Sequence, residues 1–374
     1  MVLTFNIAQL GYGARVHAGN TMQQTTEDLR IQGIRPLVSP DLLHEELPLS
    51  TNGRELINET RQQAEAIIKG DDDRLLVVVG PCSIHDTKAA LDYAEKLASA
   101  RQTFAKDLLV VMRIYFEKPR TTVGWKGLIN DPELNGSFRI NHGLRTARQL
   151  LLDLAHAGMP TACEFLDTIV PQYIADLVSW GAIGARTTES QIHRELASGM
   201  SMPMGFKNGT DGNVQIAIDA VRAAKDPHHF LSVTKQSLAA IVSTAGNSAC
   251  HVILRGSTNG PNFETEFVKE TLFKLNNAGL HNKIMIDLSH GNSSKDHTRQ
   301  PLVAADVCRQ LVQGEQGICG VMIESNLVEG KQSNTPDKEL IYGQSITDAC
   351  LSWEQTLPVL EQLAQSVQQR RQGD

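Results

Sequence analysis

The sequence has 374 residues, of which 41% are hydrophobic and 21% charged, and its formal net charge is −7. This composition provides enough apolar surface for a large core and argues against a disordered chain. The negative net charge excludes a general attraction to nucleic acids or anionic membranes, so a bound anion must be held by a local cluster of cations. No apolar run approaches the length of about 18 residues that a membrane span needs.

The cysteines and the N-terminus both indicate a cytoplasmic protein. The six cysteines stand at positions 82, 163, 250, 308, 319 and 350, without CxxC spacing. The first residues lack the charged start and apolar centre of a secretory leader. Reduced thiols in the cytoplasm are therefore expected.

From Arg74 onward, short β-branched runs alternate with amphipathic segments of helical period, which is typical of βα units and a parallel sheet. Eight strand candidates follow one another, at residues 74–80, 108–116, 160–166, 182–186, 203–208, 251–256, 283–289 and 320–325. Eight strands with intervening helices predict a closed (β/α)8 barrel of the α/β class. An open, doubly wound sheet is the alternative.

Two segments fall outside this alternation. Residues 1–73 form a polar N-terminal extension, with a helical period in the stretch INETRQQAEAIIKG. Residues 229–250 contain two short strand patterns separated by a turn, which predict a β-hairpin inserted before the sixth barrel strand. The predicted organisation is an extension over 1–73 and a barrel over 74–374 that carries the hairpin.

Positively charged residues stand at or just after the ends of several predicted strands. They are Arg113, Lys118, Arg120, Arg186, Lys207 and Arg255. The carboxyl ends of barrel strands form one mouth, where the active sites of (β/α)8 enzymes lie. Any one of these side chains alone would be an ordinary solvated charge. Together they predict a substrate rich in phosphate and carboxylate groups, because Arg and Lys bind such oxygens well.

Other polar residues near the strand ends have the chemistry of metal ligands. Cys82 follows the first strand, His290 the seventh, Glu324 lies in the eighth, and Asp348 precedes the last predicted helix. A thiolate, an imidazole and two carboxylates together suit a divalent transition metal. Glu164, in the third strand, is expected at the same mouth.

Each of these residues also has a simpler explanation. Cys82 would be a buried structural cysteine, His290 a satisfied core histidine, and the carboxylates partners of nearby cations. For one residue taken alone the simpler explanation is favoured, whereas convergence at one mouth favours the metal. A nucleophilic Cys82 would need an adjacent base and an oxyanion hole, and the nearness of His85 in sequence does not establish such a contact.

Several longer stretches together resemble one protein family. They are GPCSIHD, RIYFEKPRTTVGWKGLINDP, AIGARTTESQIHRELASGMSMPMGFKNGTDG, HVILRG, DLSHGNSSKDH and GVMIESNLVEG. From about residue 27 to the C-terminal helix, the chain is similar to the type I 3-deoxy-D-arabino-heptulosonate 7-phosphate (DAHP) synthases, the first enzymes of the shikimate pathway. The resemblance implies a metal-dependent condensation of phosphoenolpyruvate with erythrose 4-phosphate that releases phosphate.

The resemblance also implies a role for each residue at the mouth. The implied metal ligands are Cys82, His290, Glu324 and Asp348, with Mn²⁺ expected and Fe²⁺, Co²⁺ or Zn²⁺ as alternatives. The residues implied to bind phosphoenolpyruvate are Arg113, Lys118, Glu164, Arg186, Lys207 and Arg255. Arg120 and Thr121 would contact the aldose phosphate. Lys118 would also protonate the developing alkoxide, so that Lys118, Cys82 and His290 form the predicted catalytic set.

Members of this family are commonly inhibited by an aromatic amino acid that binds away from the mouth, near a subunit interface. The matching positions are Asp28, Pro171, Gln172, Met200, Ser201 and Ser232. Asp28 would pair with the effector's ammonium group, and Ser232 would help to select a phenyl or a hydroxyphenyl ring. The simpler explanations are that Asp28 caps a helix and that Ser232 is an ordinary residue of a strand.

The resemblance of FLSVTK to phenylalanine-sensitive members favours phenylalanine over tyrosine as the effector, with tryptophan last. The extension over 1–73 is accordingly predicted to serve regulation and assembly into a homodimer or homotetramer. Cys350 lies two residues after Asp348, so we expect that oxidation of the metal-free protein joins it to Cys82 and inactivates the enzyme.

Two other functions fit parts of the pattern. A related metal-dependent aldose-phosphate synthase or aldolase would share the barrel, the metal and the cations, but it would take another aldose phosphate, such as arabinose 5-phosphate. A non-catalytic, aromatic-sensing subunit is expected to have lost some metal or phosphate ligands, and all of them are present in this sequence.

Overall fold

The structure is a computed structural model of the chain, and it describes residues 26–120, 124–335 and 339–373. The chain divides into two compact units, residues 1–36 and residues 37–374. In the first unit, residues 26–36 are exposed. They contain a turn in which the amide of Ile31 donates to the carbonyl of Asp28 at 3.1 Å.

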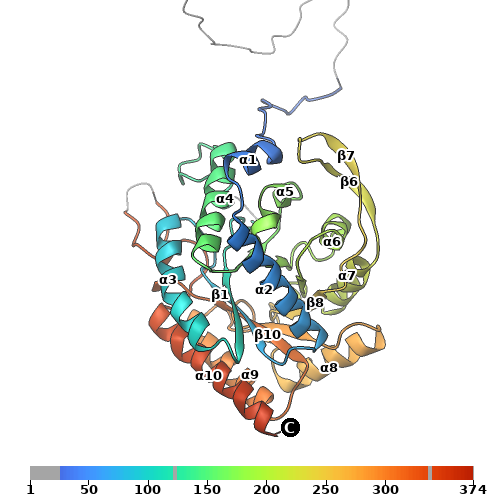
Figure 1. The fold of residues 1–374 in the computed structure, drawn as a ribbon, viewed down its shortest axis with the longest axis vertical. Helices are drawn as coiled ribbons and strands as arrows, with labels where there is room; N and C mark the ends of the chain where they lie inside the picture. Colours follow the sequence, from blue (N-terminus) through green and yellow to red (C-terminus); the bar gives the residue numbers. More distant parts are fainter. Residues whose placement is uncertain (1–25, 121–123, 336–338, 374) are drawn as a thin grey trace, which may run out of the picture. The chain divides into compact units, whose positions relative to one another are not determined.

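The second unit is built on a closed barrel of eight parallel strands (Figure 1). These strands are, in chain order, β1 (Leu75–Gly80), β2 (Leu108–Arg113), β3 (Thr161–Glu164), β4 (Trp180–Ile183), β5 (Met204–Lys207), β8 (Cys250–Leu254), β9 (Ile284–Asp287) and β10 (Ile318–Glu324). Each strand pairs with the next, and β10 pairs with β1 to close the barrel. The predicted (β/α)8 architecture is confirmed, and the open sheet is excluded.

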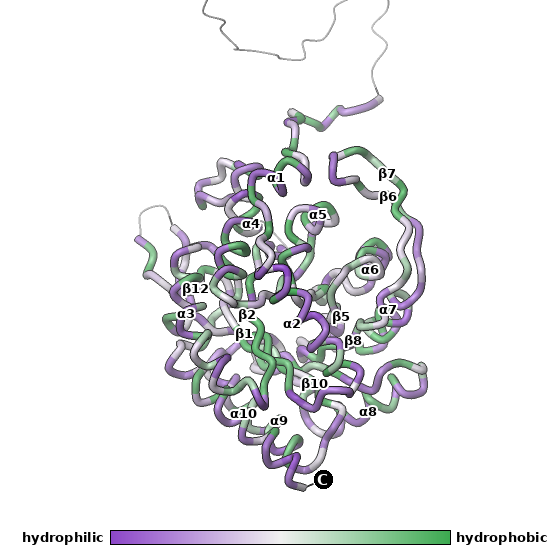
Figure 2. The backbone as a smooth tube through the Cα atoms, viewed as in Figure 1, coloured by the Kyte–Doolittle hydropathy of each residue, from purple (hydrophilic) through white to green (hydrophobic). Residues whose placement is uncertain are grey.

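The barrel strands are almost wholly apolar because both of their faces are covered. Every residue of β1 and of β10 is buried, and Figure 2 shows these strands as a hydrophobic centre between helices of mixed hydropathy. β4 begins at Trp180, two residues before the predicted start, because Trp180 pairs with Ala162 of β3. The strand also ends earlier than predicted, at Ile183, so Arg186 lies in the loop after β4.

Two helices precede the first barrel strand, and the others follow barrel strands or lie between them. The helices are α1 (Pro40–Glu46), α2 (Thr51–Lys69), α3 (Thr87–Thr103), α4 (Ile140–His156), α5 (Pro171–Ile174), α6 (Gln191–Ser198), α7 (Gln215–Lys225), α8 (Thr265–Asn277), α9 (Gln300–Val312) and α10 (Trp353–Gly373), with 3-10 turns at Ala175–Leu177 and His297–Arg299. α3 begins after Asp86, whose carboxylate accepts hydrogen bonds from the amides of Lys88 and Ala89 and so caps the first turn.

α2 closes the end of the barrel at which the strands begin. It ends at Lys69, and the next residue, Gly70, has a left-handed φ of 90° that stops the helix just before β1. Its residues Ala64, Ile67 and Ile68 are buried in one cluster with side chains of the barrel strands. Residues 37–73, assigned by the sequence to an extension, therefore belong to the same compact unit as the barrel.

A hairpin lies between α7 and β8. Its strands, β6 (His229–Val233) and β7 (Ala239–Ser243), pair antiparallel with Leu231 opposite Ile241. These two side chains are 85% and 76% exposed, so one face of the hairpin is apolar and uncovered in the single chain. A second small sheet, of β11 (Val328–Lys331) and β12 (Gln344–Ser345), follows the last barrel strand.

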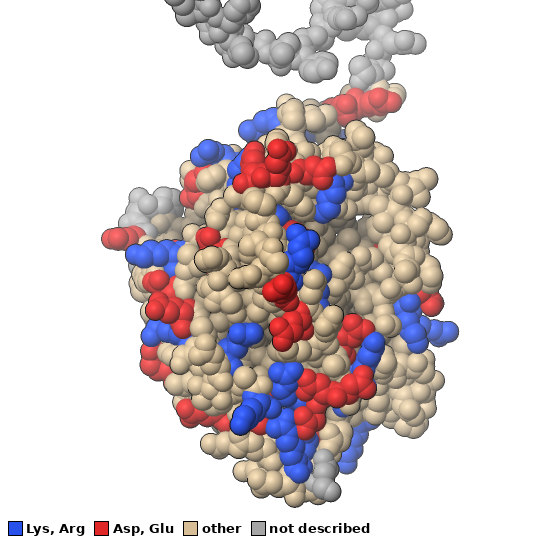
Figure 3. Space-filling model, viewed as in Figure 1, with Lys and Arg blue, Asp and Glu red and all other residues tan. Residues whose placement is uncertain are grey.

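The distribution of charged side chains over the surface is consistent with the modest net charge. On the face drawn in Figure 3, acidic and basic side chains are interspersed rather than segregated. Among the described residues, no helix combines the length and the apolar character needed to span a membrane.

Candidate active site

The predicted cations converge on one cavity at the carboxyl ends of the barrel strands. Its volume is about 210 Å³. Its lining includes Arg113, Lys118, Arg120, Glu164, Arg186, Lys207 and Arg255 together with His290, Glu324 and Asp348. Thr121 lies outside the described residues. The barrel thus gathers, from seven different strand ends or loops, side chains that are up to 235 positions apart, as counted from Arg113 to Asp348.

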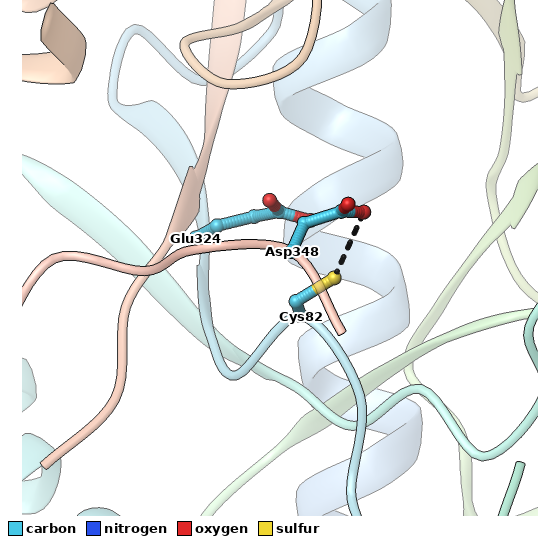
Figure 4. A group of neighbouring side chains, drawn as sticks. All are labelled: Cys82, Glu324 and Asp348. Carbon is cyan, nitrogen blue, oxygen red and sulfur yellow. Dashed lines mark hydrogen bonds between the residues drawn. The ribbon is translucent and has the colours of Figure 1, made fainter. Parts of the chain in front are cut away.

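Three of the four predicted metal ligands form a cluster beside this cavity. The ligand atoms of Cys82, Glu324 and Asp348 lie within 4.8 Å of one another. Figure 4 shows how the three side chains converge from the loop after β1, the end of β10 and the loop before α10. The Sγ of Cys82 lies 3.4 Å from Oδ2 of Asp348. Burial, and then the charge of Glu324, raises the pKa of the Cys82 thiol to about 11.

His290 stands at the edge of this cluster. It lies in the loop after β9, the seventh barrel strand, and its Nε2 is 3.7 Å from Oε1 of Glu324. Its backbone φ is 55°, in the left-handed region that non-glycine residues rarely adopt. With this imidazole the donor set is one sulfur, one nitrogen and two carboxylates, which fits a divalent transition metal.

Two cations, the half-buried Lys118 and the buried Arg113, offset the negative charge of the cluster. Lys118 places its Nζ 3.0 Å from Sγ of Cys82 and 3.6 Å from Oδ2 of Asp348. Arg113 donates to Oε1 of Glu324 at 3.0 Å. Burial by itself would raise the pKa of Asp348, but the charges of Lys118 and His290 outweigh it and lower this pKa well below its usual range. The neighbouring cations thus keep the carboxylate of Asp348 ionised, whereas the raised pKa of Cys82 keeps its thiol protonated, with the proton donated toward Oδ2 of Asp348.

Arg113 also fixes the loop that carries Cys82. It is 1% exposed, and its guanidinium lies over the ring of Tyr115, with 3.6 Å from Cζ to the ring centroid. It donates to the carbonyls of Pro81 and Cys82. This pattern holds the turn after β1 against the end of β2, so the thiol position is set by a neighbouring strand.

Lys207 lies between two buried carboxylates at the same cavity. Its Nζ is 3.6 Å from Oε2 of Glu164 and 3.3 Å from Oδ2 of Asp287. Burial opposes ionisation of Glu164, but the charge of Lys207, followed by that of Lys118, lowers the pKa of this carboxyl. Glu164 is therefore an anion at the mouth that keeps a cation in place.

Sequence reasoning missed four buried polar residues behind the mouth, namely Asp287, Asn208, Asn262 and Asn292. Oδ1 of Asn208 accepts from the amide of Arg255 at 2.8 Å and from Nδ2 of Asn262 at 3.2 Å. Oδ1 of Asn292 accepts from the amide of Asn262 at 2.8 Å. These bonds tie together the loops after β5, β8 and β9. For Asn208 and Asn292 the available signal was a polar residue one or two positions from an expected site residue, whereas Asp287 and Asn262 lie three and seven positions from one.

Five of the six predicted effector residues line a second cavity, of about 890 Å³. They are Pro171, Gln172, Met200, Ser201 and Ser232. The cavity lies between the hairpin, α5 and the end of α6, away from the barrel mouth. Asp28 belongs to the first compact unit, and its role in effector binding stays a prediction.

The six cysteines are all free and buried. Burial raises the pKa of Cys350 well above its usual range, and the Sγ of this residue lies 3.6 Å from the carbonyl of Asp348. Cys350 is therefore next to the ligand cluster. Its oxidation to a disulfide with Cys82 stays a prediction.

Comparisons with known proteins agree with this geometry. The sequence model of the DAHP synthetase I family matches residues 55–361. A phospho-2-dehydro-3-deoxyheptonate aldolase of Escherichia coli K12, described as Phe-sensitive, is 57% identical over 350 residues, which are 94% of this chain and 100% of that one. A phenylalanine-inhibited counterpart from Saccharomyces cerevisiae is 55% identical over 364 residues, covering 96% of this chain and 98% of its own.

A tyrosine-inhibited counterpart from Schizosaccharomyces pombe is 53% identical over 356 residues, covering 94% of this chain and 95% of its own. Among solved structures, a phospho-2-dehydro-3-deoxyheptonate aldolase from Francisella tularensis SCHU S4 superposes with a TM-score of 0.90 at 55% identity, covering 91% of this chain and 99% of that one. The barrel, the cationic mouth and these matches lead to one conclusion. The chain belongs to the DAHP synthetase I family.

Proposed function

We propose that the protein is a 3-deoxy-7-phosphoheptulonate synthase, which condenses phosphoenolpyruvate, D-erythrose 4-phosphate and water to DAHP and phosphate. Family membership supports this reaction, the first step of the shikimate pathway. The observation that carries it is the meeting of six cations with a cysteine–carboxylate cluster at one barrel mouth. The cations suit a substrate that carries phosphate, and the cysteine–carboxylate cluster suits a divalent metal.

The metal ligands in this proposal are Cys82, His290, Glu324 and Asp348, and the ion is Mn²⁺, with Fe²⁺, Co²⁺ and Zn²⁺ as alternatives. When bound, such an ion supplies a Lewis acid that stabilises negative charge on a substrate oxygen. The protein side chains perform the remaining work, which is to bind, orient and protonate.

The cationic side chains hold the two substrates in reacting order. Phosphoenolpyruvate binds through Arg113, Lys118, Glu164, Arg186, Lys207 and Arg255, while Arg120 and Thr121 contact the phosphate of the aldose. Carbon C3 of phosphoenolpyruvate then bonds to the aldehyde carbon, and Lys118 donates a proton to the oxygen that becomes negative. Water adds to C2 and loses one proton to solvent, and the bond from C2 to the phosphate oxygen then breaks, so that the phosphate leaves with the second proton and C2 becomes the ketone.

A chelation experiment tests the metal and the reaction together. The protein is stripped with a chelator, and consumption of phosphoenolpyruvate with erythrose 4-phosphate is followed before and after Mn²⁺ is returned. Turnover that disappears and returns supports the proposal. A Cys82→Ser variant should bind Mn²⁺ more weakly, because an alcohol is a poorer ligand than a thiolate. Turnover that is unaffected by the chelator would instead indicate that Cys82 has a structural role.

The aldose separates this function from its alternatives. The wild-type protein with Mn²⁺ is offered erythrose 4-phosphate and arabinose 5-phosphate at equal concentrations. We expect turnover with the first only. Turnover with arabinose 5-phosphate alone would favour the related synthase, and inactivity with both sugars under every metal would favour the aromatic-sensing subunit.

For regulation, we propose that an aromatic amino acid binds in the second cavity, with phenylalanine preferred to tyrosine. The phenylalanine-sensitive relatives support this preference, although a tyrosine-inhibited relative is nearly as similar. The cavity combines apolar lining, such as Phe230 and Val242, with the hydroxyl groups of Ser201 and Ser232. Inhibition assays with each amino acid at about 1 mM, within the usual range of effector affinities, test the order. Inhibition by tyrosine without inhibition by phenylalanine would reverse it.

We further propose a cytoplasmic homodimer or homotetramer. The exposed apolar pair Leu231 and Ile241 on the hairpin supports assembly, because uncovered apolar surface of this kind is typical of subunit contacts. Light scattering coupled to size-exclusion chromatography measures the mass. A Leu231→Ser, Ile241→Ser double variant should shift the population toward smaller species, and an unshifted mass would place the contact elsewhere.

A further inference from the structure

Asp287, the last residue of β9, is a fully buried carboxylate to which the proposed reaction gives no role. Its Oδ1 accepts hydrogen bonds from the amide of Ser289 at 3.0 Å and from the hydroxyl of the same residue at 2.6 Å. Its Oδ2 lies 2.9 Å from Nδ1 of His290 and 3.3 Å from Nζ of Lys207. One carboxylate therefore touches a proposed metal ligand and a proposed phosphate-binding residue at the same time.

The contacts around His290 define which of its ring nitrogens carries the proton. The hydroxyl of Ser289 uses its hydrogen on Asp287, so its oxygen is left as an acceptor toward Nδ1 of His290, at 2.7 Å. The carboxylate of Asp287 is an acceptor as well. The oxygen of Ser289 thus requires a hydrogen on Nδ1, the negative charge of Asp287 2.9 Å away favours that hydrogen although Oδ2 makes no hydrogen bond of good geometry, and the lone pair is left on Nε2. Nε2 is the nitrogen that faces Glu324.

The backbone around this turn is held from several sides. The left-handed φ of 55° at His290 is strained for a residue with a side chain, and such strain persists only where the surroundings fix it. Nδ2 of Asn292 donates to the carbonyl of Asp287 at 2.8 Å, and the amide of Leu288 donates to the carbonyl of Met322 at 2.9 Å. Asp287 itself therefore has little freedom to move, which is what an anchor for two other side chains requires.

We propose that Asp287 is a positioning residue that fixes His290 in the Nδ1–H tautomer, with Nε2 free for the metal, and aims Lys207 at the substrate phosphate. The inference rests on the proposed function, because it takes His290 as a metal ligand and Lys207 as a phosphate contact. It adds that metal binding and phosphoenolpyruvate binding depend on the same carboxylate. A partner of this kind typically changes metal affinity about 10- to 100-fold when it is lost.

The test uses the full chain carrying Asp287→Asn, which keeps the shape of the side chain and removes its charge. Mn²⁺ affinity is titrated without substrates, and phosphoenolpyruvate affinity is titrated on the metal-free protein. We expect the Mn²⁺ Kd to rise about 10- to 100-fold and the phosphoenolpyruvate Kd to rise as well. The ¹⁵N shifts of the His290 ring in the metal-free protein should report Nδ1–H in the wild type and a mixture of tautomers in the variant.

Asp296→Asn is the matched control, because Asp296 is an exposed carboxylate of the same segment that accepts from Thr298. This variant should leave both Kd values and the His290 tautomer unchanged. A folded Asp287→Asn protein with the wild-type Mn²⁺ Kd and tautomer overturns the inference. If that variant does not fold, Ser289→Ala replaces it, and an unchanged Mn²⁺ Kd there is equally contradictory. A wild-type protein that binds neither Mn²⁺ nor phosphoenolpyruvate contradicts the proposed function instead.

Discussion

A single buried histidine, His251 in β8, should make the stability of the protein depend on pH. It is 2% exposed, and neither ring nitrogen has a hydrogen-bond partner of good geometry among the described residues. Burial, opposed slightly by the backbone of Ala249, lowers its pKa from 6.5 to about 4. The unfolded chain therefore binds a proton more readily than the folded chain between these two values, and stability falls as pH falls from 6.5 to 4.

A shift of this size corresponds to about 3 kcal/mol in the free energy of unfolding, at about 1.4 kcal/mol for each pKa unit. Urea unfolding of wild type and His251→Phe at pH 7.0, 5.5 and 4.5 measures it. The variant should lose that part of the acid sensitivity, because phenylalanine does not titrate and packs beside Trp180. Replacing the exposed His281 by phenylalanine is the control. Identical pH profiles of wild type and His251→Phe would contradict the prediction.

Among the elements, α2 should be indispensable to the barrel although it precedes the first strand. Ile68 is fully buried among the side chains inside the barrel. Ile68→Ala should lower the free energy of unfolding by about 2–5 kcal/mol, because the barrel end cannot collapse to fill the space. The metal and phosphoenolpyruvate affinities should stay unchanged, since the mouth is at the opposite end of the strands.

Urea unfolding and Mn²⁺ titration check the two halves of that prediction. Gln62→Ala, on the exposed face of the same helix, serves as the control and should change the free energy of unfolding by less than about 0.5 kcal/mol. A loss of less than about 1 kcal/mol for Ile68→Ala would mean that α2 only covers the barrel and adds little to its core.

The elements and most of the mouth were predictable because each depends on local pattern. Apolar strand runs, alternation with helices and the polar residue at each strand end together indicate where Arg113, Lys207 and Glu324 converge. The role of α2 was not predictable, because a helix with one apolar stripe has the same sequence pattern whether it covers a barrel end or another surface. Asp287 was not predictable because it is the last residue of a buried strand, and its contact with Lys207, 80 positions earlier, depends on the closure of the barrel.

Contacts between loops were beyond sequence reasoning for a different reason. The bonds of the asparagine network join residues 30 to 54 positions apart, and no periodicity links such positions. Asparagine is also typical of ordinary exposed turns. Only the closure of the barrel shows that Asn208, Asn262 and Asn292 are buried side by side.

For the whole molecule, the division at residue 36 predicts that assembly of the catalytic unit and regulation can be separated. Residues 37–374 contain the barrel, α2 and both cavities, so deletion of residues 1–36 should preserve the fold and turnover with Mn²⁺. The same deletion removes Asp28, the proposed partner of the effector ammonium group. We expect turnover within about twofold of wild type and inhibition by phenylalanine weakened at least about tenfold, equivalent to losing one charged contact.

Deletion of residues 1–73 is the contrasting variant. It removes α1 and α2 as well, and it would expose interior side chains such as Leu76 and Ile253 at the open end of the barrel. That protein should be insoluble or lack a cooperative thermal transition, as measured by circular dichroism. If the shorter deletion remained as sensitive to phenylalanine as wild type, the effector site would lie wholly within residues 37–374. Asp28 would then have no part in regulation, and the ammonium group would need a partner inside the second cavity, where Asp176 is the carboxylate on its lining.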